Sequence, residues 1–355
     1  MKKKLLVATA AALLAGCLSA SAADKLKVGF IYLGPVGDFG WTYQHEAARQ
    51  ALVKEFGDKI ETTYLENVSE GPDAERSIEQ LVRAGNKLIF TTSFGYMDPT
   101  LKVAKKYPNV HFEHATGFKH DKNMGIYNGR FYEGRYIQGV IAGKMSKSGV
   151  VGYVGSVPIP EVVMGMNSFI RGMRSVNPNG KIKLVWINEW YDPGKESDAA
   201  KALIDQGADI IAQHTDSAAP LQVAEDRGVH GFGQASDMIK FAPKAQLTAS
   251  VDIWGPYYTQ RIQAAIDGTW TTGDTWGGLK AGMLAMAPFT NMSDDTAKAA
   301  QDAVDGIKDG SIVIFKGPIN DQSGNVKVAD GTQLSDDDIA GMNWLAEGIQ
   351  GTLPQ

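Results

Sequence analysis

The chain has 355 residues, a formal net charge of −5 at pH 7 and a single cysteine, Cys17. This length exceeds what one hydrophobic core usually organises, so we expect two domains. The acidic balance disfavours nucleic acid as a partner. Beyond Cys17, the composition excludes disulfides, zinc–thiolate sites and thiol nucleophiles.

Residues 1–22 begin with three lysines, continue with an apolar run and end in small residues, which is the pattern of a secretory signal peptide. The apolar run is too short to span a bilayer. Cleavage after Ala20–Ala22 would release a soluble protein, whereas the lipobox-like Leu14–Cys17 would make Cys17 a lipidated N-terminus. Removal of this segment, which contains three lysines and no acid, would change the formal net charge from −5 to −8. The sequence predicts an exported, periplasmic protein, either soluble or lipid-anchored.

Residues 27–47 predict a strand, a glycine-containing turn and the start of a helix. This is the opening unit of an α/β domain, in which ligands bind at the carboxyl ends of the strands. Asp38 and Trp41 lie in or directly after the turn and are well placed to contact a ligand. The alternative is that Trp41 packs on the core beneath its own helix, and the local pattern fits both.

The segments that follow alternate between strand and helix patterns at intervals of about 30 residues, which favours parallel sheets with right-handed crossovers. A first series ends near residue 127, and a second series of similar rhythm begins after it. The expected strands are 60–65, 88–92, 110–114, 149–156, 181–190, 208–217, 228–237 and 247–252, and the expected helices are 71–87, 99–108, 131–145, 162–176, 196–207, around 221–224, and 256–268.

The last 90 residues carry weaker patterns. Segments 276–289 and 311–321 resemble further strand pieces, and a polar helix is expected over 294–310. The acids at 335–338 are most simply explained as a helix N-terminus, where negative charge is favoured.

Aromatic residues stand beside short polar residues wherever a predicted strand ends. If two doubly wound lobes face one another, these ends converge on one cleft. Stacking surfaces with hydrogen-bonding edges suit a planar heteroaromatic ligand, because stacking contributes roughly 1–3 kcal/mol per base. A sugar also stacks on tryptophan and remains a competitor, while each aromatic taken alone could be core packing. The candidate ligand-binding residues are Asp38, Trp41, Tyr43, Phe94, Asp98, Asn128, Trp190, His214, Asp216, Asp237 and Trp254.

Catalytic and metal motifs find little support. The six histidines show no H-E-x-x-H or comparable metal-binding spacing. The sequence contains no G-x-S-x-G elbow, P-loop or G-x-G-x-x-G after a strand. Pairs of acids occur, as in any chain of this size, so a glycosidase dyad has no positive support. We expect a protein that is not an enzyme and has no cofactor.

Five segments resemble, in order and spacing, the BMP family of ABC-transporter substrate-binding proteins, the basic membrane lipoprotein or purine-nucleoside receptor type. The most specific is the Y-E-G-x-Y-x-x-G-x-x-A-G pattern beginning at Tyr132, and the similarity extends from about Lys25 to Gln260. The segments are LGPVGDFGWTYQHEA, SFGYMD, YPNVHFEHATG, GIYNGRFYEGRYIQGVIAGKMSKSGVVGYVG and ALIDQGADIIAQHTDS.

The resemblance implies a type I periplasmic-binding-protein fold, an α/β fold of two doubly wound parallel-sheet lobes joined by a hinge. Lobe 1 would comprise residues 23–127 plus about 252–275, and lobe 2 residues 128–251 plus about 276–355. A monomer closing on its ligand would present it to ABC permease subunits. By position, the resemblance assigns base stacking to Trp41 and Trp190, the turn acid to Asp38, an aromatic–acid pattern to Phe94 and Asp98, and a ligand-gripping acid to Asp237.

Departures from the family pattern bear on the ligand. Nucleoside-binding members usually read D-K-S-F-N after the first strand, whereas this chain has Thr42 where the asparagine is expected, followed by Tyr43 and His45. A lysine usual after the return strand is also replaced, by the run leading to Trp254. A flatter, smaller site favours a free nucleobase such as adenine, xanthine or urate. A nucleoside or monosaccharide receptor is the second hypothesis, and an exported nucleoside hydrolase a distant third.

Overall fold

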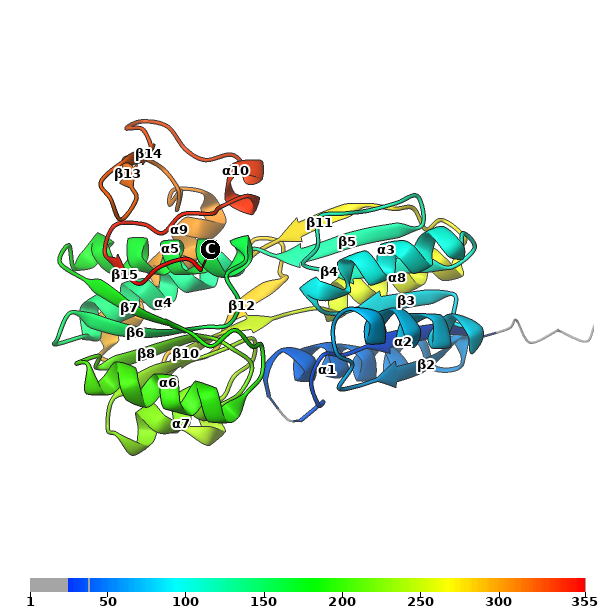
Figure 1. Ribbon diagram of the computed structural model, residues 1–355, viewed down its shortest axis with the longest axis horizontal. Coiled ribbons are helices and arrows are strands. Elements are labelled where there is room, and N and C mark those ends of the chain that lie inside the picture. The colour runs from blue at the N-terminus through cyan, green and yellow to red at the C-terminus, as the bar shows by residue number, and fades with distance from the viewer. Residues whose placement is uncertain (1–24, 38, 355) are drawn as a thin grey trace, which may run out of the picture.

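The computed structural model describes residues 25–37 and 39–354. Figure 1 shows two α/β halves side by side, each built on its own sheet. We call the half with the six-stranded sheet the first lobe and the half with the seven-stranded sheet the second lobe.

The first lobe has the strand order β11-β5-β4-β3-β1-β2, and all of its strand pairs are parallel. Without β11 the order is the doubly wound 2-1-3-4-5, in which the connections reverse direction between β1 and β3. The strands are β1 (Leu26–Ile31), β2 (Ile60–Leu65), β3 (Leu88–Thr91), β4 (His111–Ala115), β5 (Met124–Gly129) and β11 (Asp274–Gly277).

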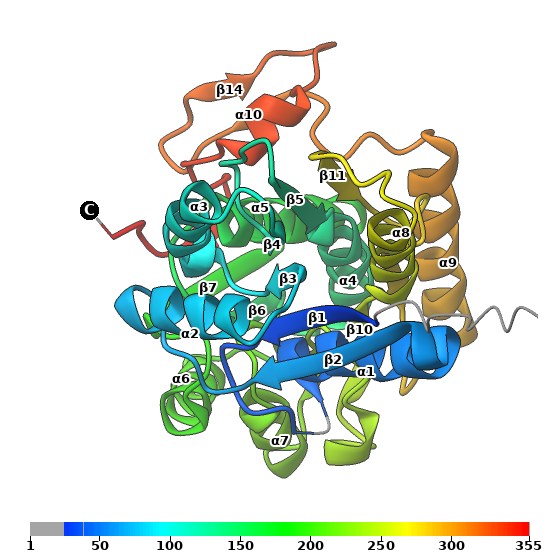
Figure 2. The ribbon, with the colours of Figure 1, turned by 90° about the vertical axis from the view of Figure 1, so that its right-hand side faces the viewer.

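Helices cover both faces of this sheet, so its central strands are apolar on both sides. In Figure 2, α2 and α3 lie on one face while α1 and α8 lie on the other. Phe30 of β1 and Phe90 of β3, neither of them exposed, stack with ring centroids 4.9 Å apart. The helices are α1 (Gly40–Phe56), α2 (Pro72–Arg83), α3 (Met97–Lys106) and α8 (Gly255–Ile266).

The second lobe repeats the same strand order, as β12-β10-β9-β8-β6-β7-β15. Its pairs are parallel except at one edge, where β12 runs antiparallel to β10. The strands are β6 (Val150–Gly155), β7 (Lys181–Trp186), β8 (Ile210–His214), β9 (His230–Gly233), β10 (Gln246–Asp252), β12 (Leu284–Met286) and β15 (Ile349–Gln350).

Two helices of the second lobe cross with their backbones almost in contact. A Cβ at Gly139 of α4 would lie 2.0 Å from the carbonyl oxygen of Phe169, and one at Gly172 of α5 would lie 2.0 Å from that of Tyr136. Only glycine permits this approach. These helices and α9 cover one face of the sheet, and α6 and α7 cover the other (Figure 1). The helices are α4 (Phe131–Met145), α5 (Pro160–Val176), α6 (Pro193–Asp205), α7 (Ala219–Asp226) and α9 (Asp294–Asp309).

The described chain passes between the lobes at three places. It leaves the first lobe between β5 and α4, returns between β10 and α8, and leaves again between β11 and β12. Arg130 lies in the first crossing, Trp254 in the second and residues 278–283 in the third.

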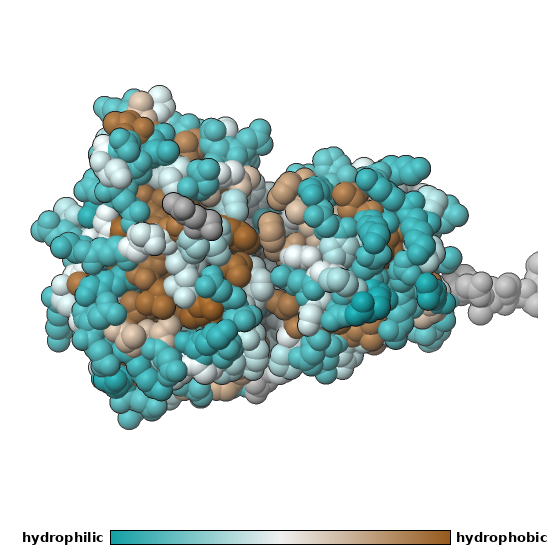
Figure 3. Space-filling model, in the orientation of Figure 1, coloured by the Kyte–Doolittle hydropathy of each residue, from teal (hydrophilic) through white to brown (hydrophobic). Residues whose placement is uncertain are grey.

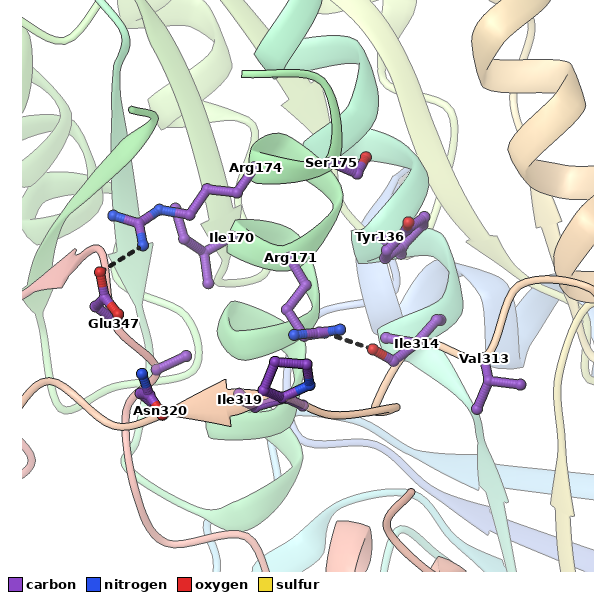
Figure 4. A pocket seen from close by; sticks show the side chains of 12 residues that line it. Tyr136, Ile170, Arg171, Arg174, Ser175, Val313, Ile314, Ile319, Asn320 and Glu347 are labelled. Atoms are coloured by element: carbon purple, nitrogen blue, oxygen red, sulfur yellow. Dashed lines mark hydrogen bonds and ion pairs between the residues drawn. The ribbon is translucent and has the colours of Figure 1, made fainter. Parts of the chain in front are cut away.

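The C-terminal segment from residue 311 onward wraps the outer face of α5. Arg171 donates from Nε to the carbonyl oxygen of Ile314 at 2.5 Å, and Arg174 pairs with Glu347 at 3.2 Å (Figure 4). The two arginines line a surface cavity of about 850 Å³. The segment contains β13 (Ile319–Asn320), β14 (Val326–Val328) and α10 (Asp336–Ala340).

The structure corrects two expectations of secondary structure. The boundary between the two series, expected near residue 127 and not as a strand, falls within strand β5. Residues 311–315, read as a strand piece, form no strand, although Ile314 and Phe315 are buried. The helix start predicted at 335–338 is confirmed, because Ser335 and Asp338 form a reciprocal capping box ahead of α10.

Candidate functional site

A pocket lies between the lobes, where the carboxyl ends of strands from both sheets meet. It encloses about 340 Å³ of space. Leu33 follows β1 and Ser93 follows β3, so the first lobe contributes at the point where its connections reverse, the usual ligand position in such sheets. Figure 3 shows the furrow between the lobes with hydrophobic residues on its walls. The lining residues are Leu33, Trp41, Ser93, Phe94, Thr116, Glu161, Trp190, His214, Asp216 and Gln234.

Trp41 forms the aromatic wall of the first lobe and is held in place on two sides. Its indole Nε1 donates to the carbonyl oxygen of Thr92 at 2.6 Å. Its ring meets the ring of Trp254 edge-on at 5.5 Å, and Trp254 is itself stacked on His45 at 5.0 Å. Trp254 is only 1% exposed, so it supports Trp41 from beneath.

Two further aromatic residues face the pocket. Phe94, in the short 3-10 helix before α3, packs against Phe118 with ring centroids 6.4 Å apart. Trp190, in the loop after β7, lies 6.4 Å from the ring of His214, and its carbonyl oxygen accepts a hydrogen bond from the amide of Asp216 at 2.9 Å. Aromatic rings therefore come to the pocket from both lobes.

The polar wall is dominated by partly buried acids of the second lobe. Burial raises the pKa of the Glu161 carboxyl to about 8, although Arg135 and a hydrogen bond from Asn128 oppose this effect. Burial also raises the pKa of Asp216 well above its ordinary value, and the charges of Glu196 and Glu161 add to it. The Glu161 carboxyl can thus be protonated near neutral pH and act as a hydrogen-bond donor as well as an acceptor.

His214 contacts Glu161, with Nε2 and Oε1 3.5 Å apart. Burial lowers the pKa of the His214 imidazole well below its ordinary value, and the charge of Arg135 adds to the effect. The imidazole is therefore neutral at physiological pH, and the contact is not an ion pair. A neutral histidine offers one donor and one acceptor nitrogen.

Arg135, on α4 and 1% exposed, is the cation behind this wall. Its guanidinium donates to the side-chain oxygens of Gln138 and Gln234. Because the oxygen of Gln234 is held by Arg135, its amide nitrogen is left to face the pocket as a donor. Burial raises the pKa of Asp252, which is 3% exposed, and the charge of Arg135 opposes this rise.

Several buried polar atoms around the pocket have no partner within the described part of the chain. An unpaired buried polar group costs roughly 1–3 kcal/mol, so a cluster of them marks a place where a ligand or water completes the bonding. The atoms are Asn128 Oδ1, Glu161 Oε2, His214 Nδ1, Asp252 Oδ2 and Trp254 Nε1.

The lobes touch directly at one rim of the pocket. The amide of Gly40, at the start of α1, donates to Ser236 Oγ of the second lobe at 2.6 Å. Gly40 has a φ of +81°, and a Cβ there would lie 2.7 Å from the carbonyl oxygen of Asp216. Phe39 packs edge-on against Phe241 at 4.5 Å. The structure is therefore closed along this rim.

Five of the residues singled out from the sequence come together in the pocket: Trp41, Phe94, Trp190, His214 and Asp216. Asn128 lines an adjoining cavity that shares Phe94, Thr116 and Glu161 with the pocket. Trp254 lies beneath Trp41, and Tyr43 is half-buried on α1 without lining the pocket. Asp38 and Cys17 lie outside the described residues.

The structure does not bring Asp98 or Asp237 into the pocket. The carboxylate of Asp98 turns outward on α3 and pairs with Lys119 at 2.7 Å, leaving its side chain 69% exposed. Asp237 is exposed and accepts hydrogen bonds from the amide of Ile239 at 3.0 Å and from Gln246 Nε2 at 2.6 Å. Both acids bind neighbouring protein groups.

The candidate residues predicted from the sequence do not include Glu161, Thr116 or Gln234, which also line the pocket. Glu161 follows Pro160 in the first turn of α5, where an acid is explained by the helix N-terminus alone. The strand-end rule, applied to β6 as it was to the other strands, would have found it.

No group of three or more potential His, Cys, Asp or Glu metal ligands occurs within residues 25–37 and 39–354. Over the same residues, every helix is too short or too polar to cross a bilayer.

The family model of the Bmp type, described as "ABC transporter substrate-binding protein PnrA-like", matches residues 25–323. The chain belongs to the Bmp family. The predicted resemblance is thereby confirmed, and the match reaches further along the chain than residue 260.

Among its relatives, this Bmp protein is 61% identical over 351 residues to a purine-binding protein of Brucella abortus strain 2308, covering 99% of this chain and 100% of the relative. It is 40% identical over 263 residues to a Haloferax volcanii protein named as a candidate ABC transporter glucose-binding protein, covering 74% and 67% of the two chains. A solute-binding protein of an ABC transporter system from Aeropyrum pernix K1 superposes with a TM-score of 0.71 at 17% identity, covering 82% of this chain and 94% of that one.

The fold class predicted from the sequence is confirmed: this Bmp protein has the two-lobed α/β fold of type I periplasmic binding proteins. Its family consists of substrate-binding proteins of ABC transporters.

Proposed function

We propose that this protein captures a purine-type ligand, a free nucleobase, between its lobes and delivers it to an ABC permease. The observation that carries the proposal is the meeting of Trp41 from the first lobe and Trp190 from the second in one pocket with buried acids and an amide. A flat heterocycle needs stacking faces and in-plane hydrogen bonds. The purine-binding relative at 61% identity supports the same ligand class.

The polar groups suit the edge of a purine. Glu161 and Asp216 accept hydrogen bonds from ring or exocyclic N–H groups when ionised and donate one when protonated. The amide nitrogen of Gln234 donates to a ring nitrogen or a carbonyl oxygen, and its orientation is set by Arg135. A bond to Glu161 also pairs its buried Oε2, which has no partner among the described residues, so a matched ligand gains more than one that lacks the group.

The proposed mechanism is closure of the two lobes around the ligand, without any covalent step. The ligand contacts both lobes and stabilises the closed form by its differential affinity, and the permease responds to closure. The contacts of Gly40 with Ser236 and of Phe39 with Phe241 support such a closed state. We propose that the moving bodies are residues 23–127 plus about 252–275 and residues 128–251 plus about 276–355.

A nucleobase is favoured over a nucleoside because aromatic rings from both lobes wall the pocket, which suits a flat ligand. The second candidate is a sugar, since carboxylates also accept hydrogen bonds from hydroxyl groups and the Haloferax relative is named for glucose. We further propose export through the leader, with Cys17 as the attachment point if the protein is lipid-anchored, and action as a monomeric binding protein rather than an enzyme.

The test is a thermal-shift panel followed by calorimetry on protein expressed from Lys25 onward, unfolded and refolded to remove bound ligand. The panel holds adenine, guanine, xanthine, urate, adenosine, inosine, ribose and glucose. We expect free purines to raise Tm more than their nucleosides do. A response to glucose alone would overturn the purine assignment, and release of ribose from a nucleoside would reveal an enzyme.

Two variants locate the binding. Trp41→Ala and Trp190→Ala should each weaken binding of the best purine by about 1–3 kcal/mol, the usual contribution of a base–aromatic stack. Trp186→Ala is the matched control, because this ring lies outside the pocket and donates to the carbonyl oxygen of Thr352 at 2.8 Å. Equal losses in all three variants would contradict the site.

A further inference from the structure

The short helix α10 lies beyond residue 323, where the family match ends, and yet it stands at the entrance of the ligand site. Figures 1 and 2 both place it beside β11, at the boundary between the lobes. With first-lobe residues Phe94 and Phe118 it lines a cavity of about 1630 Å³ that also includes Glu161 of the ligand pocket. The α10 residues in this lining are Asp336, Asp337, Ala340 and Gly341.

One acid of α10 binds the crossing between the lobes. Asp336 receives a two-pronged hydrogen bond from Arg130, with Nη1 to Oδ1 at 2.8 Å and Nη2 to Oδ2. Arg130 lies between β5 and α4, in the first of the three crossings. Such fork-like pairs are stronger and more directional than ordinary surface ion pairs.

Arg130 also binds the end of β11, where the third crossing begins. Its Nε donates to the carbonyl oxygen of Trp276 at 3.1 Å, and its guanidinium lies 4.4 Å from the centre of the Trp276 ring. Its amide donates to the carbonyl oxygen of Gly277 at 2.8 Å. Trp276 and Gly277 end β11, directly before the chain crosses to the second lobe. Arg130 therefore joins two crossings, and Asp336 holds Arg130.

The other end of α10 is fixed to the second lobe. Asn167, a fully buried residue of α5, donates to the carbonyl oxygen of Trp344 at 2.7 Å and accepts from the amide of Ala346 at 2.8 Å. Ile339 and Met342 are buried in the same core. Because α10 and the residues after it are bound to α5, the ion pair of Asp336 connects the second lobe to the crossings.

We propose that Asp336 is a positioning residue for ligand capture: through Arg130 it holds two crossings in the closed arrangement and so slows ligand release. The inference rests on the proposed function, because it concerns the lifetime of the same closed complex. Asp336 does not touch the ligand pocket itself. Its effect is therefore on lobe geometry, and any ligand of this site is released faster without it.

The test measures purine dissociation by stopped-flow tryptophan fluorescence and the radius of gyration of free and ligand-bound protein by small-angle X-ray scattering. We expect Asp336→Asn to speed dissociation by about three- to tenfold, the effect of losing a charge-assisted fork of hydrogen bonds. We also expect the free Asp336→Asn protein to be more open than the wild type. Arg130→Lys keeps the charge but loses the fork, so it should shift both readouts in the same direction.

Asp337→Asn is the matched control, since Asp337 lines the same cavity and forms no ion pair with the described residues. An unchanged Asp337→Asn protein beside a faster-releasing Asp336→Asn protein supports the inference. Equal changes in the two variants would show only a general loss of negative charge and would overturn it, as would wild-type behaviour of Asp336→Asn in both readouts. If Asp336→Asn fails to fold, Arg130→Lys decides between these outcomes.

The two proposals fail separately. If the wild-type protein binds no purine, the proposed function is wrong, while scattering from the free wild-type, Asp336→Asn and Asp337→Asn proteins still shows whether the ion pair controls lobe opening.

Discussion

Two buried carboxyl groups, one in each lobe, differ in how completely the protein satisfies them. Glu113 on β4 is fully buried and contacts three donors, Tyr257 at 2.7 Å, Trp270 at 2.7 Å and Arg261. Glu161 at the cleft is 11% exposed, faces a neutral histidine and has one oxygen without a partner among the described residues.

Burial raises the pKa of both carboxyls, but Arg261 and hydrogen bonds from Tyr257 and Trp270 oppose the shift at Glu113. The Glu113 cluster resembles a structural polar network, in which every strong group has its partner. The region around Glu161 leaves bonds to be completed from outside. The contrast separates a carboxyl that stabilises a lobe from one that is available to a ligand.

The largest expected effect is on folding stability and concerns Glu113. Glu113→Ala should lower the free energy of unfolding by about 3–5 kcal/mol, because it leaves Arg261 without its carboxylate in a largely buried position. Urea denaturation of unliganded protein measures this. Tyr257→Phe removes one donor only and should cost less. A Glu113→Ala protein as stable as the wild type would break the comparison.

The second effect is on binding. Glu161→Gln keeps the shape of the side chain but replaces its carboxyl by an amide, so purine affinity should fall by about 1–3 kcal/mol, the cost of leaving a buried donor or acceptor without its partner. The free energy of unfolding of the ligand-free protein should be unchanged or slightly higher. Calorimetry with the best purine and urea denaturation without it give the two numbers. A loss of stability without a loss of affinity would show that Glu161, like Glu113, is a structural carboxyl and not a ligand-binding one.

A third effect is a pH dependence of stability. A carboxyl whose pKa rises from 4.5 to about 8 on folding holds its proton more tightly in the folded state. Folding therefore becomes less favourable as pH rises from about 5 to about 8, because the unfolded chain ionises first. Over this range the wild type should lose about 4 kcal/mol relative to Glu161→Gln, since the range covers about three pKa units and one unit corresponds to about 1.4 kcal/mol. Parallel pH–stability curves for the two proteins would contradict the raised pKa.

Much of the fold could be predicted from local pattern. Helix 131–145 and strand 60–65 have the predicted bounds, because each carries its periodicity within the segment itself. Strand β5 could not be found this way. Its sequence contains Gly125, Asn128 and Gly129, and it is a strand because it pairs with β4 on one side and with β11, far along the chain, on the other. Segment 311–315 shows the converse, since burial of Ile314 in a loop gives the same apolar pattern as burial in a strand.

Only part of the site could be predicted, because the local sequence pattern does not determine how every side chain is oriented. Strand ends indicate which side chains reach the cleft edge, and this rule found Trp41, Trp190 and His214. It does not indicate how a side chain turns once it is there. Asp98 meets Lys119 and turns outward, whereas Glu161, which looks like an ordinary helix-start acid, is carried into the cleft by the orientation of α5.

The return of β11 to the first sheet has a consequence for how the molecule folds. Asp274 of β11 pairs with Ile126 of β5, and the whole sequence of strands β6 to β10 lies between them. Closing so long a loop is entropically costly and slow, so the second lobe can gather its own sheet while the first still lacks its outermost strand. During that interval β5 is an uncovered edge, able to pair with a strand from another chain. Arrival of β11 covers β5, and the four-residue β11 then takes its place as the edge of the sheet.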